Sequence, residues 1–315
     1  MVCLPSNIDV RPPLGVTMKG IVLAGGTGSR LFPTTRSVSK HLFPVYDKPM
    51  FYYPVSVLMM AGIREIMVIS NAESLPLIQQ ALGDGGHLGI EIEYAVQKEP
   101  RGIAEALLIG RDHIRGTRSA LVLGDNIFHG EGFPDLLGRA AASTSGCTLF
   151  GCKVSDPRHY AVAGFGEKGR FVSLVEKPSE PESDYAVTGL YFYDQDVVDI
   201  AERIEPSGRG ELEITDVNRA YLEMGRAELV TMGNEITWLD LGTEESLLEG
   251  GRYVSTMARE SGVRVACLEE IALRMGFIGA DECYRLGEEM QNSPYGEYVM
   301  EAARRAAGVW QGAGV

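Results

Sequence analysis

The chain has 315 residues, of which 29 are Lys or Arg and 43 are Asp or Glu, so its formal net charge is −14. Its 45% hydrophobic and 23% charged residues are typical of a globular protein and argue against intrinsic disorder. The acidic balance argues against broad binding to nucleic acid or to an anionic membrane, but a few local cations suffice to hold a small anion.

The first residues and the cysteines carry signals about location. Residues 1–18 show no basic stretch followed by an apolar run, so we expect a flexible N-terminal extension and no signal peptide. The most apolar stretch, 50–63, is shorter than the roughly 20 residues that span a bilayer. The five cysteines show no CxxC spacing, which favours reduced thiols in a cytoplasmic protein over a disulfide scaffold.

Strand and helix patterns alternate over the first half of the chain. Apolar runs bounded by turn residues predict strands at 20–24, 65–70, 90–97, 120–123 and 147–154. Helical patterns that end at glycine or turn residues occupy 49–61, 74–82, 102–114 and 133–142. This alternation predicts a mostly parallel sheet with helices on both faces, in which ligands bind beyond the carboxyl ends of the strands.

The pattern changes after about residue 155. A hairpin is expected at 164–175, followed by strands at 186–193, 228–232 and 236–239. Helices are expected at 196–204, 213–224 and 243–260, the last with Thr243 as its N-cap. Apolar residues near the end of the chain predict further helices. With no internal repeat, one α/β unit with an added second half is expected.

A glycine-rich loop follows the first strand. Gly25, Gly26 and Gly28 allow close approach of the backbone to a ligand, and successive N–H groups there can bind an anion that Arg30 would clamp. The loop has neither the GxGxxG spacing of dinucleotide-binding proteins nor the GK[ST] of a Walker A loop. A tight structural turn is the alternative for the glycines alone.

Five further residues are candidates for chemistry. Lys40 offers a second positive charge near Arg30, although a single lysine is more often a solvated surface residue. Asp125 and Asp240 each follow an apolar stretch and together can hold Mg²⁺, although each alone also fits a turn or helix-entry aspartate. Glu176 and its neighbour Lys177 suit sugar hydroxyls and a phosphate, or a plain surface turn. The sequence lacks HExxH and GxSxG motifs, so zinc hydrolysis and a serine hydrolase have no support.

The candidate motifs stand in a longer pattern that resembles a known family. The pattern reads KGIVLAGGTGSRLFPTT, SKHLFPVYDKPMFYYPVSVLMMAGI, LVLGDNIFHG, VEKP, YAVTGLYFYD, GELEITDVN and WLDLGT. It resembles the sugar-1-phosphate nucleotidylyltransferases over residues 19–300, and most closely their bacterial glucose-1-phosphate thymidylyltransferase branch. The resemblance implies a Rossmann-like, mostly parallel mixed sheet flanked by helices. It also implies a nucleotide-binding half at 19–155, a sugar-phosphate-binding half of the same domain at 156–260, and C-terminal helices with oligomer contacts at 261–315.

The resemblance also implies a reaction and the residues that perform it. A glucose 1-phosphate oxygen would attack the α-phosphorus of dTTP, giving dTDP-glucose for deoxysugar biosynthesis and pyrophosphate, with Mg²⁺ as cofactor. The implied catalytic residues are Arg30, Lys40, Lys177 and Asp125, and the metal ligands are Asp125 and Asp240. The implied nucleotide-binding residues are Leu23, Gly25, Gly26, Gly28, Gln97 and Gly102, the last two at the pyrimidine edge. The implied sugar-phosphate residues are Tyr160, Ala161, Glu176, Lys177, Gly189, Tyr191 and Arg209.

Several positions depart from the family pattern. His41 and Glu105 replace residues that are usually Gln, Ala161 replaces Gly, and Gly164 replaces Glu. The changes at 161 and 164 leave open an amino or deoxy sugar phosphate as the substrate. UTP remains an alternative to dTTP, because uracil and thymine share the edge that Gln97 would read.

The family pattern also implies a homotetramer with a regulatory nucleotide site between subunits. There His129, Asn234 and Met275 stand where the family has Tyr, Arg and Lys, so we expect weakened feedback by an anionic nucleotide sugar. A nucleotide-sugar-binding regulator without catalysis is the alternative of another class. The presence of both phosphate clamps and both aspartates argues against that alternative.

Overall fold

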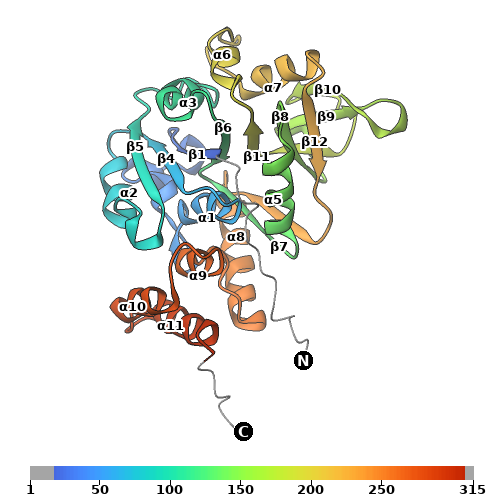
Figure 1. Ribbon diagram of the computed structural model, residues 1–315. Coiled ribbons are helices and arrows are strands. Elements are labelled where there is room, and N and C mark those ends of the chain that lie inside the picture. The colour runs from blue at the N-terminus through green and yellow to red at the C-terminus, as the bar shows by residue number, and fades with distance from the viewer. Residues whose placement is uncertain (1–17, 309–315) are drawn as a thin grey trace.

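The centre of the molecule is a nine-stranded mixed sheet with helices on both faces (Figure 1). It is described by a computed structural model for residues 18–308, so the expected N-terminal extension lies outside the described residues apart from Met18. The strand order is β10-β9-β11-β6-β1-β4-β5, with β8 paired to β11 and β12 paired to β8. The strands are β1 (Met18–Ala24), β4 (Glu65–Ser70), β5 (Glu91–Val96), β6 (Arg118–Leu123), β8 (Cys147–Lys153), β9 (Ala161–Phe165), β10 (Phe171–Glu176), β11 (Tyr185–Tyr193) and β12 (Ala227–Thr231).

The first half of the sheet is parallel, as the sequence predicts. β1 lies between β6 and β4, β5 follows β4, and all three pairings are parallel. Successive side chains of a strand point to opposite faces, and in β1 both faces are buried. Val22 belongs to one hydrophobic cluster, whereas Ile21 and Leu23 belong to the other. This explains why the strand is an unbroken apolar run.

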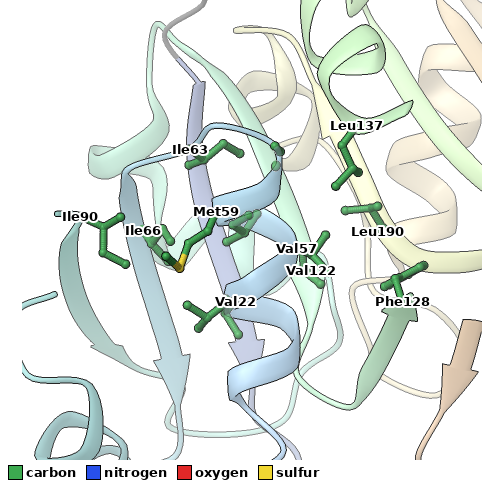
Figure 2. Close-up of a cluster of buried hydrophobic side chains, with 14 of the residues drawn as sticks. Val22, Val57, Met59, Ile63, Ile66, Ile90, Val122, Phe128, Leu137 and Leu190 are labelled. Carbon is green, nitrogen blue, oxygen red and sulfur yellow. The ribbon is translucent and has the colours of Figure 1, made fainter. Parts of the chain in front are cut away.

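Each face of the sheet is covered by its own set of helices. One face packs against α1 (Tyr52–Met60), α2 (Leu75–Leu82), α5 (Phe133–Ser143) and α9 (Leu268–Arg274). The other face packs against α3 (Glu105–Ile109), α4 (Arg111–Ile114), α6 (Val197–Ala201) and α7 (Ile214–Glu223). Figure 2 shows the first cluster, in which Val57 and Met59 of α1 lie over Val22, Ile66 and Val122 of the strands.

The second half of the sheet is largely antiparallel. The predicted hairpin is confirmed as β9 and β10, and β11 runs antiparallel to β6, β8 and β9. The strand β8 was expected to continue the parallel alternation, but β11 lies between β6 and β8 in the sheet. The strand pattern of the first half does not specify which strand pairs with β6, and the later strand β11, buried along almost its whole length, takes this central place.

Three local expectations need correction. The helix expected at 102–114 is two short helices that meet at Gly110, where a Cβ would lie 2.7 Å from Ile21 Cδ1. The helix expected from residue 49 begins at Tyr52, because Lys48–Pro49 forms β3, paired with β2 (Pro44–Val45). The strand β7 (Asn126–Gly130) was not predicted, and it pairs antiparallel with β13 (Ile236–Asp240) in a separate two-stranded sheet.

The C-terminal region is helical. α8 (Glu244–Thr256) has Thr243 as its N-cap, as predicted, and Thr243 Oγ1 accepts from the Ser246 N–H at 3.2 Å. A one-turn π-helix (Met257–Ser261) continues α8. α9, α10 (Ala280–Glu289) and α11 (Pro294–Ala306) gather at one end of the molecule (Figure 1). Within residues 18–308, none of the helices is both long and apolar enough to cross a bilayer.

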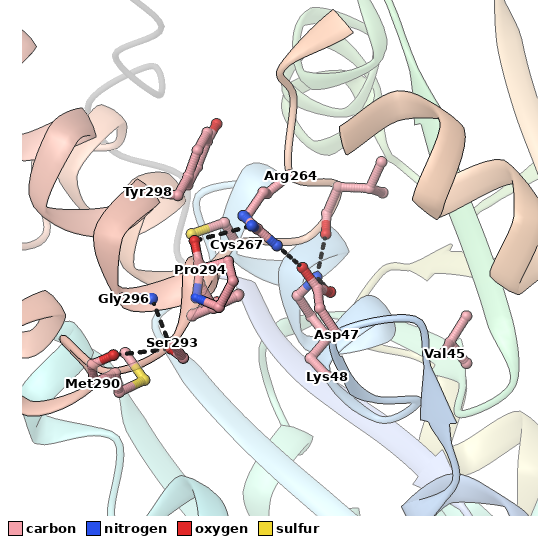
Figure 3. A network of polar contacts seen from close by, with 12 residues as sticks. Val45, Asp47, Lys48, Arg264, Cys267, Met290, Ser293, Pro294, Gly296 and Tyr298 are labelled. Atoms are coloured by element: carbon pink, nitrogen blue, oxygen red, sulfur yellow. Dashed lines mark hydrogen bonds and ion pairs between the residues drawn. The ribbon is translucent and has the colours of Figure 1, made fainter. Parts of the chain in front are cut away.

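A buried ionic cluster joins these helices to the β2–β3 hairpin, and Figure 3 shows it. Asp47 accepts hydrogen bonds from Lys48 and, at 2.5 Å, from Arg264. Lys48 Nζ also donates to the Val265 carbonyl at 2.9 Å, and Arg264 donates to the Pro294 carbonyl at 2.9 Å. We call Asp47, Lys48 and Arg264 the Asp47 cluster.

Candidate active site

A cleft of about 620 Å³ opens at the carboxyl ends of β1 and β6. This is the edge of the sheet at which ligands were expected. Of the predicted site residues, the cleft brings together Leu23, Gly25, Gly26, Arg30, Lys40, Gln97, Gly102, Asp125, Tyr160, Ala161, Glu176, Lys177, Gly189, Tyr191, Arg209 and Asp240. Gly28 does not line the cleft. It adopts a left-handed conformation with φ of 61°, and its carbonyl accepts from Thr35 Oγ1 at 2.7 Å, so it shapes the loop from behind.

Two carboxylates and one lysine lie at the floor of the cleft. Asp240 ends β13 directly opposite Asn126 of β7, the neighbour of Asp125, and Lys40 donates a hydrogen bond to Asp125. Burial acts to raise the pKa of Asp125, but the Lys40 charge, the neighbouring His41 and hydrogen bonds from Lys40 and Asn126 together lower that pKa to about 2. Burial, added to the negative charge of Asp125, raises the pKa of Asp240 to about 7. The charges of Lys40, Arg30 and Lys177 act in the opposite direction but do not offset burial at Asp240.

The donor set at Asp125 and Asp240 suits a divalent cation with oxygen ligands. Magnesium in proteins is commonly held by one or two carboxylates, with water and substrate phosphate oxygens filling the other positions. Among residues 18–308, no group of three or more His, Cys, Asp or Glu side chains converges on one point. The two aspartates thus fit a metal that substrate helps to hold, and they do not form an all-protein cage.

His41 lies behind this pair and is 2% exposed. Burial, together with the adjacent Lys40 charge, lowers its pKa to about 3. Its Nδ1 is 3.1 Å from Ser39 Oγ. His41 is therefore a neutral hydrogen-bonding group, which explains how it can occupy a position where the family pattern has an uncharged amide.

Asn126 is a functional position that the site prediction missed. Its Nδ2 donates to Asp125 Oδ1 at 2.9 Å, and its Oδ1 accepts from the Gly189 N–H at 3.1 Å and from Trp238 Nε1 at 2.6 Å. Trp238 in turn packs edge-on against Tyr160, with ring centroids 5.1 Å apart. One buried amide thus orients the Asp125 carboxylate and fixes the wall expected to meet the sugar. Its place directly after Asp125 was the only signal in the sequence.

Gln97 and Gly102 form the wall expected to meet the nucleobase. Gln97 follows β5, and its amide is 5% exposed. Gly102 has a φ of 103°, and a Cβ there would lie 2.3 Å from the Leu212 carbonyl oxygen, so a side chain has no space. This contact also ties the wall to the segment that carries Glu211 and Glu213, both of which line the cleft.

Lys177 has an unusual backbone. Its φ of 43° lies in the left-handed region, which side chains rarely adopt, and its N–H donates to the Tyr160 carbonyl at 3.0 Å. Such strain concentrates at functional sites. Beside it, Thr215 Oγ1 donates to Glu176 Oε2 at 2.6 Å and fixes that carboxylate in the cleft. No local sequence signal indicates this conformation or the Thr215 contact.

Arg209 and Arg30 approach the cleft from different segments. Arg209 Nη2 donates to Glu213 at 2.8 Å, and this bond raises the pKa of the guanidinium above its ordinary value. Glu176 Oε1 lies 4.0 Å from the same nitrogen. Arg30 is exposed beside Gly242, where a Cβ would lie 3.2 Å from Arg30 Nη1, and it forms no ion pair within residues 18–308.

Two residues of β9, Ala161 and Gly164, differ from the family pattern, and only one of them lines the cleft. Ala161 lines the cleft, so its methyl group bears on the substrate space. Gly164 does not line it, and a Cβ at Gly164 would lie 1.9 Å from Ser173 Oγ, so a larger residue would displace the Ser173–Glu182 hydrogen bond. Only the change at 161 can act directly on the bound sugar.

The residues expected at a regulatory site also lie outside this cleft. His129 is half-buried and its Nδ1 is 2.7 Å from the Tyr253 hydroxyl, and burial lowers its pKa. Met275 is buried, and Asn234 is exposed. Cys147, Cys152, Cys267 and Cys283 are free thiols, as predicted, whereas Cys3 lies outside the described residues.

Comparisons with known proteins show the family to which the chain belongs. The family described as nucleotidyl transferase matches residues 19–256. A glucose-1-phosphate thymidylyltransferase of Xanthomonas campestris is 51% identical over 289 residues, which cover 92% of this chain and 98% of the relative. One of Mycobacterium tuberculosis is 48% identical over 288 residues, covering 91% of this chain and all of the relative.

Solved structures give the same result. A crystal structure from Bacillus anthracis described as a glucose-1-phosphate thymidylyltransferase superposes with a TM-score of 0.69 at 39% identity, covering 75% of this chain and 95% of the other. A UDP-glucose pyrophosphorylase structure shares the fold, with a TM-score of 0.68 at 22% identity over 76% of this chain. The predicted mostly parallel α/β architecture is confirmed.

Proposed function

This chain belongs to the nucleotidyl transferase family, among its glucose-1-phosphate thymidylyltransferases, and we propose that it condenses dTTP with α-D-glucose 1-phosphate. The products are dTDP-glucose, a precursor for deoxysugar biosynthesis, and pyrophosphate. The single observation that carries the proposal is that one cleft joins four cationic side chains to two half-buried carboxylates. These are Arg30, Lys40, Lys177, Arg209, Asp125 and Asp240.

The reaction requires two anions to meet. A phosphate oxygen of glucose 1-phosphate forms a bond to the α-phosphorus of dTTP, and the bond from that phosphorus to the bridging oxygen of pyrophosphate breaks. The attacking phosphate is ionised at neutral pH, so no general base is required. The protein must therefore bring the reactants into line and offset their charge.

The cleft has separate groups for the two reactants. Lys177 and Arg209 would hold the sugar phosphate, with Glu176 accepting from sugar hydroxyls in the orientation that Thr215 imposes. Arg30 and Lys40 would meet the triphosphate above the glycine loop. Bound at Asp125 and Asp240, Mg²⁺ would supply positive charge to the phosphate oxygens. Asp240 forms no ion pair within residues 18–308, so its carboxylate oxygens are available to such an ion.

The test is pyrophosphate release with a panel of nucleoside triphosphates and sugar 1-phosphates, with and without Mg²⁺. We expect release with dTTP and glucose 1-phosphate that depends on Mg²⁺. UTP, amino sugar phosphates and deoxy sugar phosphates in the same panel test the closest alternatives. Tight binding of dTDP-glucose without release for any pair would instead support a regulator without catalysis.

The family relationship extends the proposal to assembly. A homotetramer is expected, with contacts through the C-terminal helices, and analytical ultracentrifugation measures it directly. The loss of two cations at Asn234 and Met275 supports weakened feedback by a nucleotide sugar. Strong inhibition by a nucleotide sugar that a co-crystal structure places away from the active-site cleft would contradict this part of the proposal.

A further inference from the structure

We propose that Glu105 is a specificity-determining residue, because it decides which end of the Gln97 amide faces the nucleobase. The proposal rests on the proposed function, since it concerns the base of the nucleotide substrate. Gln97 lines the cleft, whereas Glu105 lies behind it at the start of α3 and is 8% exposed. Glu105 therefore acts through Gln97 and not by touching the substrate.

The Gln97 amide has two acceptors on its inner side. Its Nε2 donates to Glu105 Oε2 at 2.9 Å and approaches the Gly102 carbonyl at 3.4 Å. Its Oε1 is on the opposite side, above the glycine loop, where a Cβ on Gly25 would lie only 2.2 Å from it. The amide thus presents an acceptor to the cleft and keeps its donors inside.

The Glu105 carboxylate cannot adapt to the opposite orientation. Its other oxygen, Oε1, accepts from Arg101 Nε at 3.1 Å, and a carboxylate paired with an arginine accepts hydrogen bonds without donating. The loop between them is anchored, because Leu212 N donates to the Arg101 carbonyl at 2.7 Å and Ala104 N donates to the Leu212 carbonyl at 3.1 Å. A rotated Gln97 would place its oxygen against the carboxylate oxygen, with both groups buried and unpaired.

An acceptor on the protein selects a donor on the base. Thymine and uracil carry a hydrogen on ring nitrogen N3, whereas N3 of cytosine carries a lone pair. Gln97 Oε1 can accept from the former and would repel the latter. A site built to hydrogen-bond one group discriminates strongly against an analogue that lacks it. The Glu105–Gln97 pair therefore excludes cytosine nucleotides and leaves thymine and uracil undistinguished.

The isosteric change Glu105→Gln makes this testable. Arg101 Nε, which donates to Glu105 Oε1 in the wild type, favours the orientation that turns Oε1 of the new amide outward and the Nε2 group inward. That donor then faces Gln97, which must rotate to offer its oxygen and so presents its own N–H groups to the cleft. We expect the substitution to move the site toward a base with an accepting N3.

The experiment compares dTTP with 5-methyl-dCTP, which keeps the thymine methyl group. Wild-type kcat/KM should favour dTTP by at least about a hundredfold, and Glu105→Gln should reduce that ratio by at least about tenfold. The matched control Arg101→Gln keeps the carboxylate beside Gln97 and should retain the wild-type ratio. The double variant Arg101→Asp with Glu105→Gln should restore the ratio, because the introduced carboxylate accepts from the new amide and turns the amide oxygen toward Gln97.

Several outcomes would overturn the proposal. Equal use of the two nucleotides by the wild-type enzyme is one, and this measurement needs no variant. An equal loss of kcat/KM for both nucleotides in Glu105→Gln is another, since it would mark a merely structural role. Should that variant not fold by circular dichroism, Glu105→Ala frees the amide to rotate and should still reduce the ratio.

Calorimetric binding of dTTP and 5-methyl-dCTP without sugar phosphate separates the two proposals. Absent pyrophosphate release, with nucleotide selectivity that still depends on Glu105, would contradict the proposed function alone. Normal release with unchanged selectivity in Glu105→Gln would contradict the role of Glu105 alone.

Discussion

Two buried groups of charges in this protein are built in opposite ways. In the Asp47 cluster, one carboxylate lies between two cations, and the carbonyls of Val265 and Pro294 accept from the remaining donors. The Lys48 ammonium also faces the rings of Tyr53 and Tyr295 at 5.3 and 5.4 Å. In the cleft, Lys40 pairs with Asp125, whereas Asp240 forms no ion pair within residues 18–308, and burial together with the charge of Asp125 raises the pKa of Asp240.

The difference between the two groups of charges indicates a structural role for the Asp47 cluster and a ligand-binding role for the cleft. A buried charge that has its partners inside the protein holds segments together, here the β2–β3 hairpin and the C-terminal helices. A buried charge that lacks a partner leaves electrostatic free energy for a ligand to recover. The same residue types, Asp, Lys and Arg, occur in both groups, and the groups differ in whether every carboxylate has a direct ion-pair partner.

The largest expected effect is on catalysis. Lys177→Ala should lower kcat/KM for pyrophosphate release by about a thousandfold while the fold is retained, because a transition-state charge contact is removed. Lys168→Ala is a matched control, since Lys168 is exposed and also has a left-handed backbone, with φ of 60°. Near-normal turnover in Lys177→Ala would remove this lysine from the site.

The next effect is on stability at the Asp47 cluster. Asp47→Asn should lower the free energy of unfolding by about 3 kcal/mol, because it leaves two buried cations without a counter-charge. Urea unfolding measures the change, and turnover of the folded fraction should stay close to wild type. Asp112→Asn, whose side chain is 95% exposed, is the control. A loss below about 1 kcal/mol would show that water already reaches the cluster.

Removal of a carboxylate charge from the cleft is expected to stabilise the fold, in contrast to its removal from the Asp47 cluster. In metal-free protein at about pH 8, Asp240→Asn should raise the free energy of unfolding by at least about 1 kcal/mol. The Asp240 pKa of about 7 in the folded state exceeds its ordinary value of 3.8, so ionisation of Asp240 opposes folding. The penalty is complete above about pH 7 and fades as the pH falls toward about 4. A thermal denaturation series over this range measures it, and destabilisation by Asp240→Asn would contradict the comparison.

The smallest effect is expected at His41. His41→Gln should change the activation free energy of turnover by less than about 1.5 kcal/mol, because it exchanges one neutral hydrogen-bonding group for another. With its pKa lowered to about 3, His41 is neutral over the working range, so the pH–rate profile between about pH 5 and 8 should be the same in both proteins. If the wild-type pH–rate profile changed slope near neutral pH and this change were absent in His41→Gln, the imidazole would be shown to carry charge.

The site could be predicted from the sequence to the extent that its residues follow strands. Gly25 and Asp125 come directly after apolar runs whose carboxyl ends meet at one edge of a parallel sheet, so their convergence follows from the strand pattern. Asn126 and Thr215 were missed, because each acts by a hydrogen bond to another side chain and leaves no periodic signal.

The sequence by itself determined the parallel half of the sheet, the glycine loop and the family, since these depend on apolar runs and on motifs of neighbouring residues. The tertiary structure decided which charged and polar side chains meet in the cleft. The pairing of β7 with β13 brings Asp240 beside Asp125, Lys177 itself adopts a left-handed backbone, and Glu105 accepts a hydrogen bond from the Gln97 amide. Each of these depends on a contact between distant segments or on a backbone angle, and local hydrophobic pattern encodes neither.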